Sequence, residues 1–152
     1  MSLLLFKQKL YKLLCEEMDN RIKELQITLD SAIHSRNSDT KSSAGDKHET
    51  GREMLQQEID QYTSRLAVLN QQFQILKNIN PEKCHKTIAG GSIVKTNTGI
   101  FFFSIAAQKI ITDNQECFPI SIDSPIGHTF KGKTAGESFR FNNREIEVLE
   151  VC

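Results

Sequence analysis

The sequence predicts an α+β chain in which a long antiparallel helical hairpin precedes a small domain of short strands. Three observations predict this fold class. Apolar residues recur with alternating spacings of four and three in two separate stretches, as they do in coiled coils. A polar segment, residues 34–53, separates those two stretches. After Pro81 the helical period gives way to short alternating runs that are punctuated by turn residues, which is typical of strands.

The two periodic stretches have matching lengths. From Tyr11 to Ala32 and from Leu55 to Leu76 there are 21 residue steps each, or about 32 Å of helix. Folding the chain back pairs Ala32 with Leu55 and Tyr11 with Leu76. This symmetry favours a hairpin within one chain over residues 1–80, and a coiled coil between chains or part of a helical bundle is the alternative. The seam residues are Tyr11, Cys15, Met18, Ile22, Leu25, Leu29 and Ala32, then Leu55, Ile59, Tyr62, Leu66, Leu69, Phe73 and Leu76.

The polar segment is predicted to form the tip of this hairpin, at about residues 34–53. It contains no large apolar side chain, and its middle falls near Ser43. Asp46 and Glu49 have the spacing of a capping box at the start of the second helix. The segment is neutral, because four acids (Asp39, Asp46, Glu49, Glu53) balance four bases (Arg36, Lys41, Lys47, Arg52).

Residues 81–152 are predicted to form the second, α+β domain. Strands are expected at 92–96, 99–106 and 117–122. Ser124 suits an N-cap and Pro125 the first turn of a short helix, which Gly132 could end. The alternating segments "ESFRF" and "REIEVLEV" flank Asn142 and Asn143, a pair that suits a type I′ hairpin turn.

Composition limits the function classes. Lys and Arg together number 19, as do Asp and Glu, so strong autonomous binding of DNA or RNA is not expected. The four cysteines are scattered without zinc-site spacing, and we expect unused thiols in a reducing compartment. The apolar start "MSLLLF" is too short for a signal peptide or a membrane span. We therefore expect a cytoplasmic protein without membrane contact.

Residues 121–137, "SIDSPIGHTFKGKTAGE", resemble the bacterial GreA/GreB transcript-cleavage and elongation factors. The match is Ser-x-x-Ser-Pro-aliphatic-small, followed by Gly132 and Gly136-Glu137. At the tip, Asp39-Thr-Lys41 followed by Ala44 is similar to the family's D-L-x-E-N-A-E segment. The architecture resembles that family over nearly the whole chain. Thr129 and Phe130 depart from it, because a small and an aliphatic residue are expected there.

The resemblance implies a mechanism for the tip. In that family the hairpin enters the secondary channel of RNA polymerase, where two tip carboxylates help to hold a second Mg²⁺ against backtracked RNA. Hard oxygen ligands suit this ion. Asp39 falls on the first carboxylate and would be the shared metal ligand. Ser42 stands where the second is expected, and Asp46 and Glu49 are the nearby acids that could replace it.

The resemblance also implies a docking site. The family's C-terminal domain, similar in fold to FK506-binding proteins, contacts the rim of the polymerase channel through the turn before its short helix. In this sequence that turn is Ser121, Asp123, Ser124 and Pro125. In the structural alternative, Ser124 and Pro125 simply start a helix.

The resulting prediction is a monomeric transcription elongation factor that binds RNA polymerase and touches nucleic acid only within the elongation complex. It is not expected to be an enzyme alone, and it has no cofactor beyond Mg²⁺ shared with the polymerase. A non-cleaving regulator of the same architecture is the alternative within this class. Other classes are a scaffold whose heptads pair between chains and a peptidyl-prolyl isomerase. The isomerase would use a pocket of Phe101, Phe102, Phe103, Phe130, Phe139 and Phe141.

Overall fold

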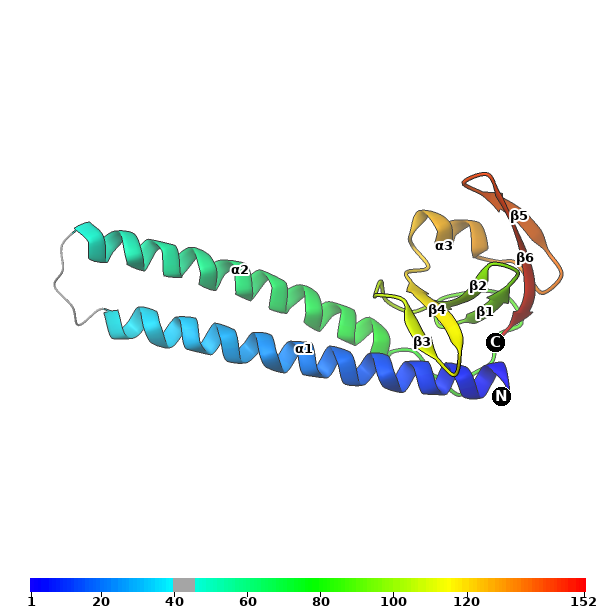
Figure 1. The fold of residues 1–152 in the computed structure, drawn as a ribbon, viewed down its shortest axis with the longest axis horizontal. Coiled ribbons are helices and arrows are strands. Elements are labelled where there is room, and N and C mark those ends of the chain that lie inside the picture. The colour runs from blue at the N-terminus through cyan, green and yellow to red at the C-terminus, as the bar shows by residue number, and fades with distance from the viewer. Residues whose placement is uncertain (40–45) are drawn as a thin grey trace. The chain divides into compact units, whose positions relative to one another are not determined.

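The computed structural model describes residues 1–39 and 46–152, with side chains for residues 1–38 and 49–152. Helices α1 (Leu3–Asp39) and α2 (Asp46–Lys77) precede a six-stranded sheet with one short helix, which confirms the predicted α+β class (Figure 1). The chain forms two compact units, Cys15–Gln74 and Met1–Leu14 with Ile75–Cys152. The predicted boundaries, 1–80 and 81–152, differ from these units because the first turns of α1 belong with the sheet.

The unit Cys15–Gln74 is an antiparallel pair of helical segments that lie side by side (Figure 1). Leu29, Ala32 and Ile59 form its buried cluster. Ile33, Tyr62 and Leu66 pack against that cluster. Every predicted seam residue is buried or half-buried, so the heptad periodicity identified the apolar faces of both helices.

The first fourteen residues pack differently from the rest of α1. Leu3, Phe6, Leu10 and Leu14 are buried in the sheet unit, whereas Leu5 is exposed. Their spacings of three and four residues place the buried side chains on one face of the helix. The apolar N-terminal run is therefore part of the core of the second unit.

The sheet is mixed, with the strand order β3-β4-β2-β1-β6-β5. Strand β2 pairs in parallel with β4, and the other neighbouring pairs are antiparallel. The Ile93 and Cys152 backbones exchange two hydrogen bonds, which extend the pairing of β1 with β6. The bounds are β1 (Ile93–Thr96), β2 (Gly99–Phe103), β3 (Ile110–Thr112), β4 (Gln115–Ile120), α3 (Pro125–Phe130), β5 (Ser138–Phe141) and β6 (Arg144–Val151).

Two tight turns made of Asp and Asn residues connect β3 with β4 and β5 with β6. Asn142 and Asn143 both have positive φ angles, of 50° and 63°, as the predicted type I′ turn requires. Asp113 and Asn114 adopt the same left-handed conformation between β3 and β4. Strand β3 was not predicted, and β4 begins two residues earlier than the predicted strand 117–122, because the Asp-Asn turn signal was missed.

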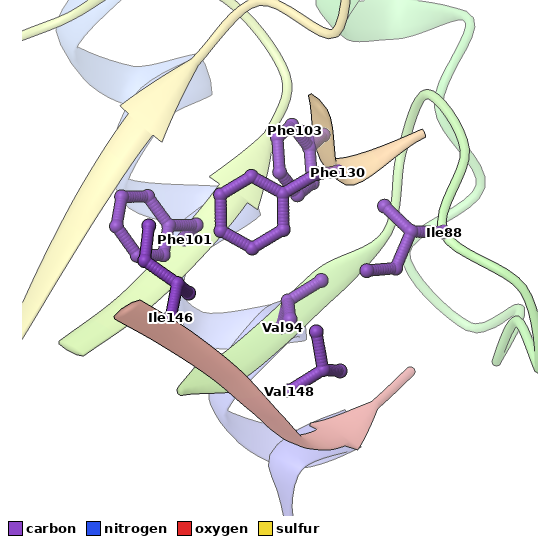
Figure 2. Close-up of a cluster of buried hydrophobic side chains, with 7 residues drawn as sticks. All are labelled: Ile88, Val94, Phe101, Phe103, Phe130, Ile146 and Val148. Carbon is purple, nitrogen blue, oxygen red and sulfur yellow. The ribbon is translucent and has the colours of Figure 1, made fainter. Parts of the chain in front are cut away.

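Phenylalanine rings pack with aliphatic side chains in the sheet core (Figure 2). The fully buried Phe130 of α3 lies between Phe101 and Phe103 of β2, with ring centroids 5.0 Å and 5.1 Å away. Phe139 meets Phe130 edge-on at 4.8 Å, an arrangement that aromatic rings favour. This cluster holds α3, and with it the preceding turn, against the sheet.

Candidate functional site

The turn before α3 contains side chains that hold its backbone in place and other side chains that are exposed. Ser124 Oγ accepts the Gly127 N–H at 3.0 Å and donates to the Ser121 carbonyl at 2.6 Å. Ser121 Oγ accepts the Asp123 N–H at 3.2 Å. The predicted N-cap is therefore confirmed. Asp123 and Pro125 are exposed, so these two side chains are available for contact with a partner.

The rest of the 121–137 motif builds the same loop. A Cβ on Gly127 would lie 2.4 Å from the carbonyl oxygens of both Ser121 and Ile122, so only glycine fits there. Gly132 and Gly136 have positive φ angles of 84° and 95°, a conformation that glycine adopts without strain. Glu137 accepts the Thr134 N–H. Much of the motif therefore specifies a backbone conformation.

The predicted tip carboxylates fall at the ends of the two long helices. Asp39 is the last residue of α1 and Asp46 the first of α2. Their side chains lie outside the described part of the chain, as does the whole of Ser42. Glu49 is exposed in the first turn of α2, where a carboxylate interacts favourably with the helix dipole. The capping box of Asp46 and Glu49 stays a prediction.

The described side chains near the tip include both positively and negatively charged groups. A pocket of about 420 Å³ is lined by Arg36, Asn37, Glu49, Arg52, Glu53 and Gln56. Arg36 Nη1 donates to Gln56 Oε1 at 2.8 Å, which links α1 to α2. Gln56 Nε2 in turn donates to Asp60 Oδ1 at 3.0 Å. Arg36 and Arg52 thus line this pocket together with Glu49, which the sequence had suggested as a replacement for the second tip carboxylate.

The six candidate phenylalanines of an isomerase pocket are mostly core. Phe101, Phe102, Phe103 and Phe130 are buried, and Phe139 and Phe141 are half-buried. A separate pocket of about 390 Å³ is bordered by Phe101 and Phe141. Its other lining residues are Thr98, Ile126, Asn142, Arg144 and Ile146.

A polar cluster in the sheet unit was not predicted. Lys7 is 0% exposed, and its Nζ donates to the carbonyls of Lys83 at 2.6 Å and Cys152 at 3.2 Å. Burial and the positive charge of Lys83 lower the pKa of Lys7 from 10.5 to about 8. The sequence did indicate that Lys7 is buried, because residues 3, 7, 10 and 14 have the spacing of one helix face.

His85 and Ser92 belong to the same cluster. Ser92 Oγ accepts the Ala89 N–H at 2.9 Å and lies 3.0 Å from His85 Nδ1. Burial lowers the pKa of His85, the positive charges of Lys7 and Lys83 lower it further, and a hydrogen bond with the Cys152 backbone opposes them.

Cys84 and Cys152 form a disulfide across 68 residues. This corrects the expectation that all four cysteines are unused thiols, which rested on their wide separation in the sequence. Strand β6 brings Cys152 back to the segment that precedes β1. Burial raises the pKa of the Cys117 thiol from 9.0 to about 12, so this thiol is unreactive.

The described part of the chain contains neither a metal-binding cluster nor a helix suited to a membrane. In residues 1–38 and 49–152, whose side chains the structure describes, no three His, Cys, Asp or Glu side chains gather as they would around a metal ion. None of the helices in this part of the chain is both long and apolar enough to cross a membrane.

Comparison with solved structures shows a structural likeness. No family model matches the chain, and no curated protein matches it. A solved structure titled "Structure of the transcription factor Gfh1" is 20% identical, and the alignment covers 90% of this chain and 92% of the other. The TM-score of this likeness is 0.37.

Proposed function

We propose that this protein is a transcription factor that binds RNA polymerase and reaches into the secondary channel with its helical hairpin. The observation that carries the proposal is the pair of long helices, α1 and α2, whose apolar seam leads to a polar connection. From Cys15 to Asp39, α1 spans about 37 Å, a reach suited to a narrow channel. The resemblance of residues 121–137 to the GreA/GreB factors supports the same partner.

Binding through the turn before α3 is tested with purified bacterial RNA polymerase. Asp123→Ala and Pro125→Ala remove exposed side chains and should weaken binding while leaving the fold intact. Lys95→Ala, at an exposed position on β1, is the control and should bind normally. Wild-type protein that does not bind polymerase would refute the proposal.

We propose regulation of elongation as the effect of this binding, and cleavage stimulation as a second version of it. The position of Asp39 at the end of α1 supports cleavage, whereas Arg36 and Arg52 in the tip pocket favour occupation of the channel alone. In either version the protein has no catalytic activity or cofactor of its own, because any Mg²⁺ would be shared with the polymerase.

A stalled, backtracked elongation complex distinguishes the two versions. Faster RNA shortening that is lost in Asp39→Ala, and reduced in Asp46→Ala or Glu49→Ala, identifies a cleavage factor. Glu53→Ala, one helical turn beyond Glu49, is the matched control. Unchanged RNA length together with an altered elongation rate identifies a regulator that does not stimulate cleavage.

Peptidyl-prolyl isomerase activity is a weaker candidate. The pocket beside Phe101 and Phe141 is the observation in its favour. Phe102, Phe103 and Phe130 are buried in the core and offer no surface to a substrate. We expect no isomerisation of a proline peptide by the purified chain.

A further inference from the structure

Three segments of the sheet unit converge on the disulfide between Cys84 and Cys152. Lys7 comes from the start of α1, Lys83 and Cys84 from the connection before β1, and Cys152 from the end of β6. A single ammonium group, Lys7 Nζ, donates to the carbonyl of Cys152 and to that of Lys83, the residue before Cys84. Lys7 thus holds both sides of the disulfide together.

The two sulfur-bearing residues differ in their access to solvent. Cys84 is exposed, whereas Cys152 is 3% exposed. A thiolate in solution therefore approaches the disulfide from the Cys84 side. Cys152 is the residue that leaves, and the ammonium group of Lys7, 3.2 Å from the carbonyl oxygen of Cys152, supplies a positive charge beside that residue.

We propose that Cys84 and Cys152 form a reversible thiol–disulfide exchange site that reacts with dithiols, with Lys7 as its positioning residue. One thiolate of the dithiol attacks the Cys84 sulfur, the disulfide breaks, and Cys152 leaves as a thiolate. The second thiol of the dithiol then attacks the mixed disulfide and releases Cys84. Two electrons and two protons pass from the dithiol to the protein, and the dithiol becomes a disulfide.

The surrounding hydrogen bonds explain why the exchange is reversible. The Ile93 and Cys152 backbones exchange two hydrogen bonds, and Lys7 bonds to both sides of the pair. None of these contacts needs the S–S bond, so the reduced thiols stay close enough to reoxidise. Disulfides with one sulfur-bearing residue open to solvent are accessible to thiols, and accessible disulfides are typically the labile ones. The proposal does not depend on polymerase binding.

The first experiment uses the full chain and dithiothreitol. Aliquots are quenched with acid, alkylated under denaturing conditions and analysed by mass spectrometry, which counts the thiols that have appeared beyond Cys15 and Cys117. We expect one disulfide in the oxidised protein and its full return after the reductant is removed. Limiting alkylation of the reduced protein should label Cys84 before Cys152. Four alkylated thiols before reduction, or faster labelling of Cys152, would overturn the proposal.

The role of Lys7 is tested by the rate of reduction at pH 7. Lys7→Met should slow the reaction roughly three- to tenfold, because the Cys152 thiolate leaves less readily without the nearby charge. Lys9→Met is the matched control. Lys9 lies on the same helix but is paired with Asp113 at 2.8 Å, so its removal should leave the rate unchanged. Equal rates in the two variants would exclude Lys7 from the exchange.

A pH profile of the wild-type protein tests the same point without a variant. The titratable groups around Lys7 are Lys83, which is exposed, and His85, whose lowered pKa keeps it neutral above pH 7. The rate per dithiothreitol thiolate should fall roughly three- to tenfold from pH 7 to 9 as Lys7 loses its proton. A flat profile would show that the charge of Lys7 does not assist the reaction.

Discussion

Lys7 is a lysine that the fold holds away from water, and its ionisation should affect stability. Its pKa is about 8 in the folded protein and 10.5 in the reference state. Between these values the unfolded chain binds more protons, so stability rises with pH across this window. Each pKa unit corresponds to about 1.4 kcal/mol.

Lys7→Met isolates this contribution. The wild-type free energy of unfolding minus that of the variant should increase by a few kcal/mol from pH 8 to 10.5, because the cost of burying the charge disappears. Urea unfolding of both proteins at several pH values measures the difference, in which other titrations cancel. A difference that does not change with pH would mean that Lys7 titrates as it does in the unfolded chain.

Gly127 tests the claim that the 121–137 motif specifies backbone conformation. Gly127→Ala places a methyl group against two carbonyl oxygens, and we expect a loss of about 1–3 kcal/mol in the free energy of unfolding. His128→Ala, at the exposed neighbouring position of α3, should change it by less than about 0.5 kcal/mol. Chemical denaturation measures both, and equal effects would contradict the steric argument.

Residues whose role depends on their near neighbours in the sequence were predictable. Ser124 caps α3 because its side chain accepts a backbone N–H three residues away. Asn142 and Asn143 form a tight turn because both adopt positive φ angles. The carbonyl partners of Lys7 lie 76 and 145 residues away. Only the folded sheet creates that environment, so periodicity indicates burial of Lys7 without indicating what it binds.

At the scale of elements, the hairpin should depend on its seam. Ile59 is 6% exposed and belongs to the cluster with Leu29 and Ala32. Ile59→Ala should lower the stability of the hairpin by about 2–4 kcal/mol. Ile27→Ala, at a position that is 67% exposed on α1, is the control and should have little effect. Circular dichroism during urea unfolding measures the change.

The same variants distinguish a hairpin within one chain from a coiled coil between chains. In sedimentation we expect monomers for the wild-type protein and for both variants, with unfolding midpoints that do not depend on concentration. A wild-type dimer that dissociates in Ile59→Ala would support the scaffold alternative.

Helix elements were easier to predict than strand order. Both long helices follow from repeated spacings within one segment, whereas the parallel pairing of β2 with β4 depends on the path of the chain between them. The disulfide from Cys84 to Cys152 depends in turn on β6 lying beside β1. Candidate tip residues were found by resemblance, and Asp39, Ser42 and Asp46 remain predictions because their side chains are not described.

At the scale of the molecule, the disulfide should stabilise the sheet unit. It closes a loop of 68 residues, and the loop-entropy model gives about 4 kcal/mol for a loop of this size. Cys84→Ser should therefore lower the free energy of unfolding by about 2–4 kcal/mol. Reduced wild-type protein should have the same free energy of unfolding as Cys84→Ser. Cys117→Ala cannot serve as the control variant, because Cys117 is a buried core residue. Equal stability of oxidised and reduced protein would contradict this prediction.

The sheet unit is assembled from the two ends of the sequence, Met1–Leu14 and Ile75–Cys152, and this has a consequence for synthesis. A ribosome delivers the chain from its N-terminus, so Leu3, Phe6 and Leu10 emerge long before residues 75–152, which complete their unit. The helical segments between Cys15 and Gln74 can pair while translation continues, because their contacts lie close in sequence. The apolar start of α1 therefore stays without the rest of its unit until residues 75–152 have left the exit tunnel, and its side chains are open to contacts with other chains during that interval.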